Sequence, residues 1–213
     1  MRRIAPLAIV LSLVLSLGLV SFNGSAQNAL EQLAKQQISQ KTGINPNLIA
    51  TLFVTKDQDQ FVLAFVYINQ AVMQSKLKPE LKTAIAPFVG QKALLTLVVP
   101  TRRSFFSPLK LSFQQGALSY LIAADSVHPV ADKFEAGFFE ANTVRAGVIL
   151  LPSAIDISQP WQITYDGSFS TTFSLSEAPA AQPPQNNSPL PARGFLFLLL
   201  QFILLFFLLP FLV

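Results

Sequence analysis

Hydrophobic and polar positions follow four different patterns along this chain, and the first is a long apolar run near its start. Arg2 and Arg3 precede almost unbroken apolar sequence over residues 4–20, and the small residues Gly24-Ser25-Ala26 follow. Basic, then apolar, then small residues are the order of a secretory signal peptide. We therefore expect a signal peptide over residues 1–26 that is removed from the mature protein. The alternative is an uncleaved anchor, because the apolar run is long for a signal peptide.

The second pattern is another apolar run, over residues 195–213, which contains no charged side chain and a single amide at Gln201. A helix of this length spans about 28 Å, which is close to the hydrocarbon thickness of a bilayer. The run therefore predicts one C-terminal transmembrane helix. Gln201 falls near mid-membrane depth, where an amide can bond to a second helix and favour oligomers.

The third pattern is a polar segment without periodicity over residues 177–194, just before the apolar tail. It is rich in Pro, Ala, Gln and Asn, and such a segment cannot bury enough apolar surface to fold. We expect a polyproline-like stalk that holds the preceding domain up to about 50 Å from the membrane.

The fourth pattern is short-range and fills the exported region, which begins with a small α+β part over residues 27–100. Spacings of three and four predict a helix that starts at Asn28 and ends at Gly43. Two strand-length runs, 48–55 and 61–68, flank a polar turn and predict a hairpin. The second run is apolar on both faces, so we expect both of its faces to be covered. A second helix over 79–89, ended or kinked by its proline, and a strand over 92–99 complete this part.

Beyond Pro100 the pattern predicts strands only. Asp166-Gly167 is the strongest hairpin signal in the chain. We expect a β-sandwich-like part over residues 101–176, and the two parts can share one core. The predicted fold class is mainly β with two short helices, an α+β fold followed by the transmembrane helix. The six predicted strands cover residues 109–113, 118–123, 134–140, 144–151, 161–165 and 168–175.

Charge and cysteine content narrow the class of protein. Fifteen Lys and Arg residues stand against eleven acids, but Arg2 and Arg3 leave with the signal and Arg193 adjoins the membrane. The remaining net charge is about +1, too small to collect phosphates, so no nucleic-acid partner is expected. The chain has no cysteine, which fits a disulfide-free exported domain of a prokaryotic envelope.

The strongest candidate for binding is a short segment between two prolines. It contains Arg102, Arg103, Phe105 and Phe106. We expect a stiff loop whose cations meet lipid headgroups or an acidic partner while the rings insert or stack. The alternative places both rings in the core and leaves the arginines in solvent.

Catalytic and metal signals are weak. His128 is the only histidine, whereas zinc sites usually use several His or Cys ligands, so no metal or cofactor is predicted. We expect a polar loop around His128, stiffened by Pro129. Ser107 and Lys110 match a Ser-x-x-Lys pattern, but Pro108 leads into a strand, whereas that motif opens a helix.

These observations predict a single-pass membrane protein of non-catalytic binding or scaffolding type, displayed on the extracytoplasmic side. Its expected partners are the lipid bilayer and either an envelope protein or a second copy through the membrane helix. One alternative is an anchored envelope hydrolase. The other is a tail that acts as a processing signal. Residues 190–194 resemble a sortase-type sorting signal with Arg193 in place of Thr, and residues 186–188 before the apolar tail resemble a GPI signal.

Overall fold

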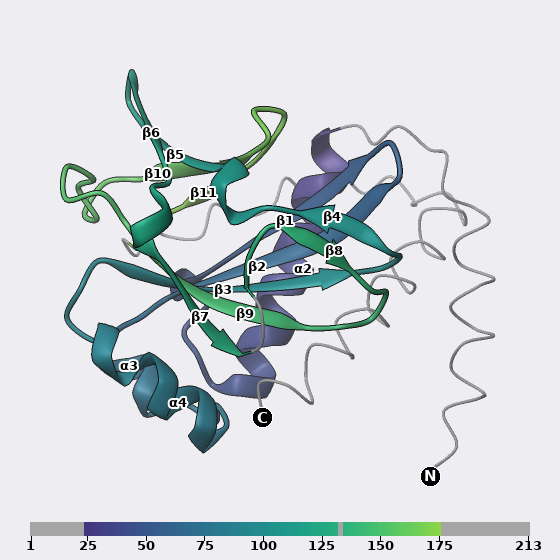
Figure 1. Ribbon diagram of the computed structural model, residues 1–213. Coiled ribbons are helices and arrows are strands. Elements are labelled where there is room, and N and C mark those ends of the chain that lie inside the picture. The colour runs from purple at the N-terminus through teal and green to yellow at the C-terminus, as the bar shows by residue number, and fades with distance from the viewer. Residues whose placement is uncertain (1–23, 132–133, 176–213) are drawn as a thin grey trace, which may run out of the picture.

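The computed structural model describes residues 24–131 and 134–175, which form antiparallel sheets with helices at one side (Figure 1). The prediction of a mainly β, α+β fold is confirmed. The predicted stalk and the predicted transmembrane helix with Gln201 lie outside the described residues. Residues 1–23 of the predicted signal peptide do so as well, whereas its last three residues, Gly24 to Ala26, form the start of helix α2 (Gly24–Thr42). Within the described ranges, no helix combines the length and the apolar character needed to cross a membrane.

The first sheet has five antiparallel strands and takes them from both sides of Pro100. Its order is β1-β2-β3-β9-β7. The predicted hairpin is confirmed, because β1 and β2 pair along their whole length. Residues Phe61 to Tyr67 of β2 and all of β3 are buried, so the prediction that the second strand is covered on both faces also holds. The strands are β1 (Ile49–Lys56), β2 (Asp59–Tyr67), β3 (Ala93–Pro100), β9 (Arg145–Leu150) and β7 (Val127–Ala131).

Helices cover one face of this sheet. The long helix α2 ends as predicted, because Gly43 adopts φ 70° and its N–H bonds back to the carbonyl of Ser39 at 2.8 Å. Pro87 breaks the second predicted helix into an α-helical part and a 3-10 turn. The helices are α2 (Gly24–Thr42), α3 (Gln70–Met73) and α4 (Pro79–Ile85), and the 3-10 turns are η1 (Pro46–Leu48), η2 (Ala86–Phe88), η3 (Pro108–Lys110) and η4 (Ala124–Ser126).

The second sheet has four strands in the order β11-β10-β5-β6. Both of its predicted hairpins are confirmed, since β10 pairs with β11 around Asp166-Gly167 and β5 pairs with β6 around Gly116. A separate two-stranded pair joins β4 to β8. The strands are β11 (Phe169–Phe173), β10 (Trp161–Tyr165), β5 (Leu111–Gln115), β6 (Leu118–Leu121), β4 (Ser104–Phe106) and β8 (Gly137–Phe139).

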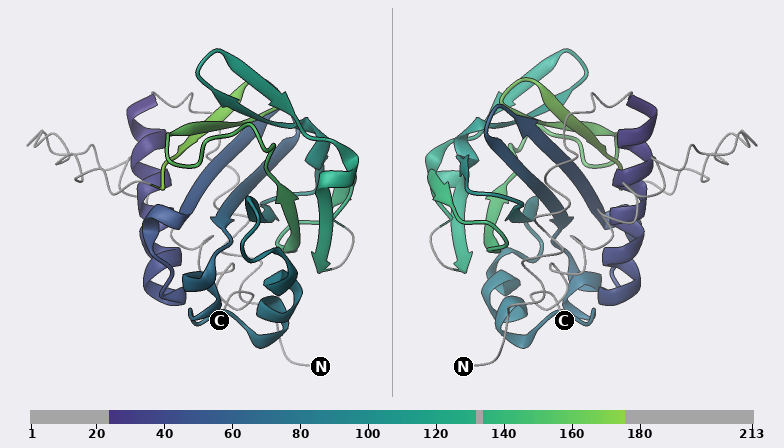
Figure 2. Two further views of the ribbon diagram at one scale, coloured as in Figure 1. Left: turned by 90° about the vertical axis from the view of Figure 1, so that its left-hand side faces the viewer. Right: turned by 90° about the vertical axis from the view of Figure 1, so that its right-hand side faces the viewer.

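Two apolar layers hold these elements together. On one face of the first sheet, α2, α3 and α4 bury Ile38, Val72 and Ile85 against it. On the other face, side chains of the first sheet, the second sheet and the β4–β8 pair share one core. Figure 2 shows α2 standing along one side of the first sheet while the second sheet lies across its top. Trp161 and Tyr165 belong to the shared core, where the Trp161 and Phe173 rings stack at 4.8 Å.

An ion pair joins the hairpin turns of the two sheets. Lys56, at the end of β1, lies 2.6 Å from Asp166, in the turn before β11. The chain then runs along β11 away from this turn and leaves the described residues at Leu175. The end of the domain that carries Lys56 and Asp166 is therefore opposite to the end where β11 finishes.

Three predicted elements were wrong in detail. The expected loop at Arg102 to Phe106 contains strand β4, and the expected loop at His128 is strand β7. Pro129 fits β7 because this strand lies at the edge of its sheet and shifts register beside the proline. The predicted strand 134–140 is reduced to β8, because Phe134 instead turns its ring into the core, beside Gly147 of β9.

Candidate binding surfaces

Strand alternation separates the two phenylalanines of the predicted binding segment. Phe106 is buried in the shared core, stacked at 5.7 Å on Tyr165, whereas Phe105 points to the other side of β4 and is only half-buried. Hydrogen bonds from β2 hold β4 in place. The Phe105 N–H donates to the Asp59 carboxylate at 2.7 Å, and the Gln60 N–H donates to Ser104 Oγ at 2.9 Å.

Phe105 belongs to an exposed group that we call the aromatic–basic patch, defined as Arg103, Phe105, Lys110 and Phe138. Phe105 and Phe138 are directly opposite on β4 and β8, and their rings meet edge to face at 5.5 Å. The Arg103 guanidinium lies 4.9 Å from the Phe138 ring centre, and the Lys110 ammonium lies 5.8 Å from that of Phe105. Phe138 is 64% exposed. Two cations therefore frame two paired rings at the surface.

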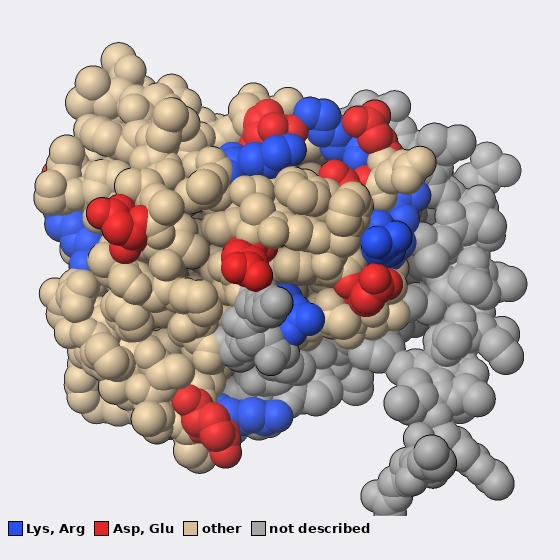
Figure 3. Space-filling model, viewed as in Figure 1, with Lys and Arg blue, Asp and Glu red and all other residues tan. Residues whose placement is uncertain are grey.

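Carboxylates lie beside both cations of the patch. Arg103 Nε is 3.4 Å from Glu140, and Lys110 Nζ is 3.6 Å from Asp166. On the face drawn in Figure 3, blue and red side chains are intermixed, and neutral surface covers most of the rest. The patch therefore offers aromatic and directional contacts rather than a broad positive field.

The other predicted residues of this segment have different roles. Arg102 donates from Nη2 to the carbonyl of Asp57 at 2.6 Å, so it supports the β1–β2 turn, where Asp57 adopts φ 51°. Phe106 is a core residue. The structure thus brings Arg103 and Phe105 together and places Arg102 and Phe106 elsewhere.

Sequence reasoning missed Lys110 and Phe138 as members of the patch. Phe138 comes from a segment more than thirty residues further along the chain, which β8 pairs to β4. No local pattern indicates that pairing. The only available signal was the alternation Gly137-Phe138-Phe139, which sends one of two adjacent rings outward when the other is buried.

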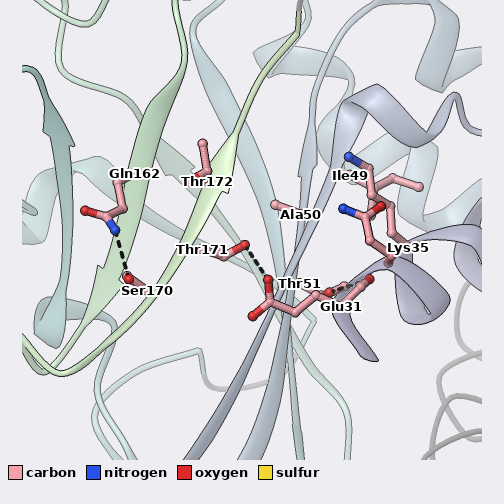
Figure 4. Close-up of a pocket in the computed structure, with 10 residues that line it drawn as sticks. Glu31, Lys35, Ile49, Ala50, Thr51, Gln162, Ser170, Thr171 and Thr172 are labelled. Atoms are coloured by element: carbon pink, nitrogen blue, oxygen red, sulfur yellow. Dashed lines mark hydrogen bonds between the residues drawn. The ribbon is translucent and has the colours of Figure 1, made fainter. Parts of the chain in front are cut away.

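A second candidate is a polar groove of about 440 Å³ between α2, the edge of β1 and the second sheet (Figure 4). Glu31 crosses it, because its carboxylate accepts a hydrogen bond from the Thr171 hydroxyl and its carbonyl accepts one from Thr51, both at 3.1 Å. Lys35 also lines the groove, and burial lowers the pKa of its ammonium. Hydroxyl, amide and charged groups here can hydrogen-bond a small polar ligand.

The candidates for catalysis are not brought into a common site. Ser107 donates its N–H to Tyr165 Oη at 3.3 Å, and burial raises the pKa of Tyr165 to about 12. His128 lies on the edge strand β7, with its ring 5.1 Å from that of Phe88. In the part of the chain that the structure describes, no three acidic or histidine side chains gather as a metal site would require.

Comparison with other proteins gives no relative from which a function could be transferred. No protein-family model, no curated protein and no solved structure matches this chain. The geometry of its own surfaces is therefore the basis for inferring what it does.

Proposed function

We propose that this is a membrane-anchored, extracytoplasmic protein of non-catalytic type, whose domain binds another envelope protein through the aromatic–basic patch. The proposal assigns residues 1–26 to a cleaved signal, residues 177–194 to a stalk and residues 195–213 to a transmembrane anchor. The apolar runs at both ends and the proline-rich segment support this arrangement. The sandwich-like stacking of the second sheet on the first supports a compact displayed domain.

The observation that carries the binding role is the exposed Phe138 ring, held between Phe105 and Arg103. Large apolar side chains are usually buried, and an exposed group of them commonly marks an interaction site. The paired rings of Phe105 and Phe138, with Arg103 over one of them, are such a group. Phe and Arg are both enriched at protein–protein contacts, and Arg is prominent among the residues that contribute most to binding. The patch therefore has the composition of a small protein interface.

Charge balance favours a protein over an anionic lipid surface. Lipid headgroups attract clusters of cations, at about 1 kcal/mol per Lys or Arg near the membrane. Here Arg103 stands beside Glu140, and Lys110 stands beside Asp166. The carboxylates offset the cations, so little net attraction to an anionic membrane remains. A protein can satisfy both signs with its own side chains.

Photo-crosslinking in the native host tests this proposal. A benzophenone-bearing phenylalanine replaces Phe138 in the full chain, and the matched control carries it at Thr83, an exposed residue of α4. We expect one discrete protein adduct from position 138, none from position 83, and loss of the adduct when Arg103→Ala is added. Adducts with lipid alone, equal adducts at both positions, or no adduct at position 138 would each contradict a protein-binding patch.

A further inference from the structure

The sheet edges of this fold are protected unequally. The outer edge of β1 and the edge strand β11 lie next to each other, and Glu31 of α2 binds both through Thr51 and Thr171. The edge strand β7 carries Pro129 and a shift of register, which are two common means of blocking further pairing. The remaining edge strand of the two larger sheets is β6, and within the described residues no strand pairs with its outer side.

The side chains of β6 are apolar at exposed positions, which is typical of an edge strand that pairs with another strand. Leu118 and Leu121 are 62% and 81% exposed, and Tyr120 is half-buried between them. No charged residue occurs from Leu111 to Ala124, so β6 lacks the lysines that usually protect an exposed edge. The β5–β6 hairpin projects at the upper left of Figure 1, and the same region of Figure 3 shows neutral surface only.

The hairpin geometry determines which backbone groups of β6 are free. Gln115 and Leu118 close a two-residue turn, and the pair that closes such a turn is hydrogen-bonded. Hydrogen-bonded and non-hydrogen-bonded pairs alternate along an antiparallel ladder. Ser119 and Leu121, which face Gln114 and Ser112, therefore direct their N–H and C=O groups away from β5. Two donors and two acceptors point outward from an apolar edge.

We propose that β6 pairs antiparallel with β6 of a second copy of this chain, about a two-fold axis that passes beside Tyr120. In this register Ser119 of one copy faces Leu121 of the other, and both of these residues present their free backbone groups. The two Tyr120 side chains then lie directly opposite each other in a non-hydrogen-bonded pair. The second sheets of the two copies become one continuous antiparallel sheet.

The chemistry of the edge favours a second copy over an unrelated partner. A two-fold interface brings the edge beside the same edge of the second copy, so charges of one sign on this edge would be brought close to one another. β6 carries no charged side chain and exposes two leucines, so the edge is complementary to itself. This pairing uses neither the aromatic–basic patch nor a membrane helix, and it stands independently of the proposed function.

The absence of cysteine makes disulfide trapping a direct test. Tyr120→Cys is introduced into the full chain in membranes of its native host, with Thr83→Cys as the matched exposed control. Facing residues of a non-hydrogen-bonded pair have Cα atoms about 4.5 Å apart, within the range that a disulfide spans. Under mild oxidation we expect most Tyr120→Cys chains to form covalent dimers, while Thr83→Cys and Ser119→Cys chains each remain at least fivefold less crosslinked.

A second measurement keeps the test valid if Tyr120→Cys disturbs folding. Chains carrying Ser119→Cys and Leu121→Cys are expressed together, and the mixed dimer is expected in excess over dimers of Ser119→Cys alone. Adding Leu121→Lys to Tyr120→Cys should reduce the dimer at least fivefold, because it places a charge against the second copy. Absence of both crosslinks, or equal crosslinking at Thr83→Cys, would overturn the pairing. A dimer unaffected by Leu121→Lys would do so as well.

Discussion

The two larger sheets of this fold use their faces differently. In the first sheet, β3 is buried at every position and β2 at nearly every position, because helices cover one face and the second sheet covers the other. In the second sheet, β10 alternates between buried and partly exposed positions. Trp161, Ile163 and Tyr165 face the core, whereas Gln162 and Thr164 face outward. The first sheet is therefore covered on both faces, whereas the second sheet exposes one face and the edge strand β6 to solvent.

Stability and binding are therefore expected to depend on different regions of the molecule. Substitutions in the first sheet are expected to act on folding, because its side chains have packed neighbours on both faces. Substitutions on the outer face of the second sheet and on the patch are expected to act on binding with little effect on folding.

Removing a ring from the first sheet should be the most damaging change. Phe65 of β2 is fully buried between the first and second sheets. Phe65→Ala is expected to lower the free energy of unfolding by about 3–5 kcal/mol. The matched change on the second sheet, Thr172→Ala at an exposed position of β11, should cost less than about 1 kcal/mol. Urea unfolding measures both, and similar losses would contradict the division between the sheets.

A glycine in the first sheet gives the next largest effect. A methyl group added at Gly147 would lie 2.1 Å from Cδ1 of Phe134, whereas one added at Gly137 meets no atom within 4 Å. Neither glycine needs a positive φ. Gly147→Ala should therefore destabilise the fold by about 1–3 kcal/mol through overpacking, and Gly137→Ala should be nearly neutral. Equal thermal unfolding midpoints for the two variants would show that Phe134 does not occupy this position.

Two buried threonines, one in each sheet, differ in whether their hydroxyl groups are hydrogen-bonded. Thr96 of β3 is fully buried, and its hydroxyl has no hydrogen-bond partner within residues 24–131 and 134–175. Thr171 of β11 donates its hydroxyl to Glu31. Thr96→Val should leave stability unchanged or raise it, because it removes an unsatisfied group, whereas Thr171→Val should cost about 1 kcal/mol. Urea midpoints that rank the two variants in the opposite order would refute this assignment.

The smallest expected effect lies where the two sheets are joined. The hydrogen bond from Lys56 holds the pKa of Asp166 below its usual range. The ionised pair therefore adds stability above the unfolded-state pKa of about 3.9, and this contribution is lost as the pH falls through the lower folded-state value.

Asp166→Asn tests this pair, since Asn accepts the φ of 52° at this turn. The variant should be slightly less stable than the parent at pH 7, and urea midpoints at successively lower pH should show the difference shrinking as the pH falls through the folded-state pKa of Asp166. A difference that persists in acid would indicate a role for Asp166 other than its charge.

Local patterns were sufficient to predict the hairpins and the main helix. Three turn signals each predict a hairpin, and the structure contains all three hairpins: those at Asp166-Gly167, at Gly116 and at the polar turn after Lys56. The continuous apolar run of β2 also predicted burial on both faces. Hairpins depend on residues that are neighbours in sequence, and burial of both strand faces is visible as a continuous apolar run.

Features that depend on distant residues were not predictable in the same way. The patch requires β4 to pair with β8, and no periodicity near Phe105 indicates Phe138 as its partner. The strand at His128 was missed because Pro129 usually marks a loop, and only its place at a sheet edge makes a strand possible. The groove at Glu31 likewise combines the first helix with the last strand.

The direction of β11 has a mechanical consequence. The described part of the chain ends two residues beyond this strand, at Leu175, opposite to the turn at Asp166, beside which Lys110 of the patch lies. If a partner holds the patch while the proposed stalk is pulled, the force acts along β11 and slides it past β10. All five residue pairs between these strands then share the load at once, instead of opening one after another. The domain is therefore expected to resist tension between the patch and the C-terminal end of β11 better than tension applied across the sheet.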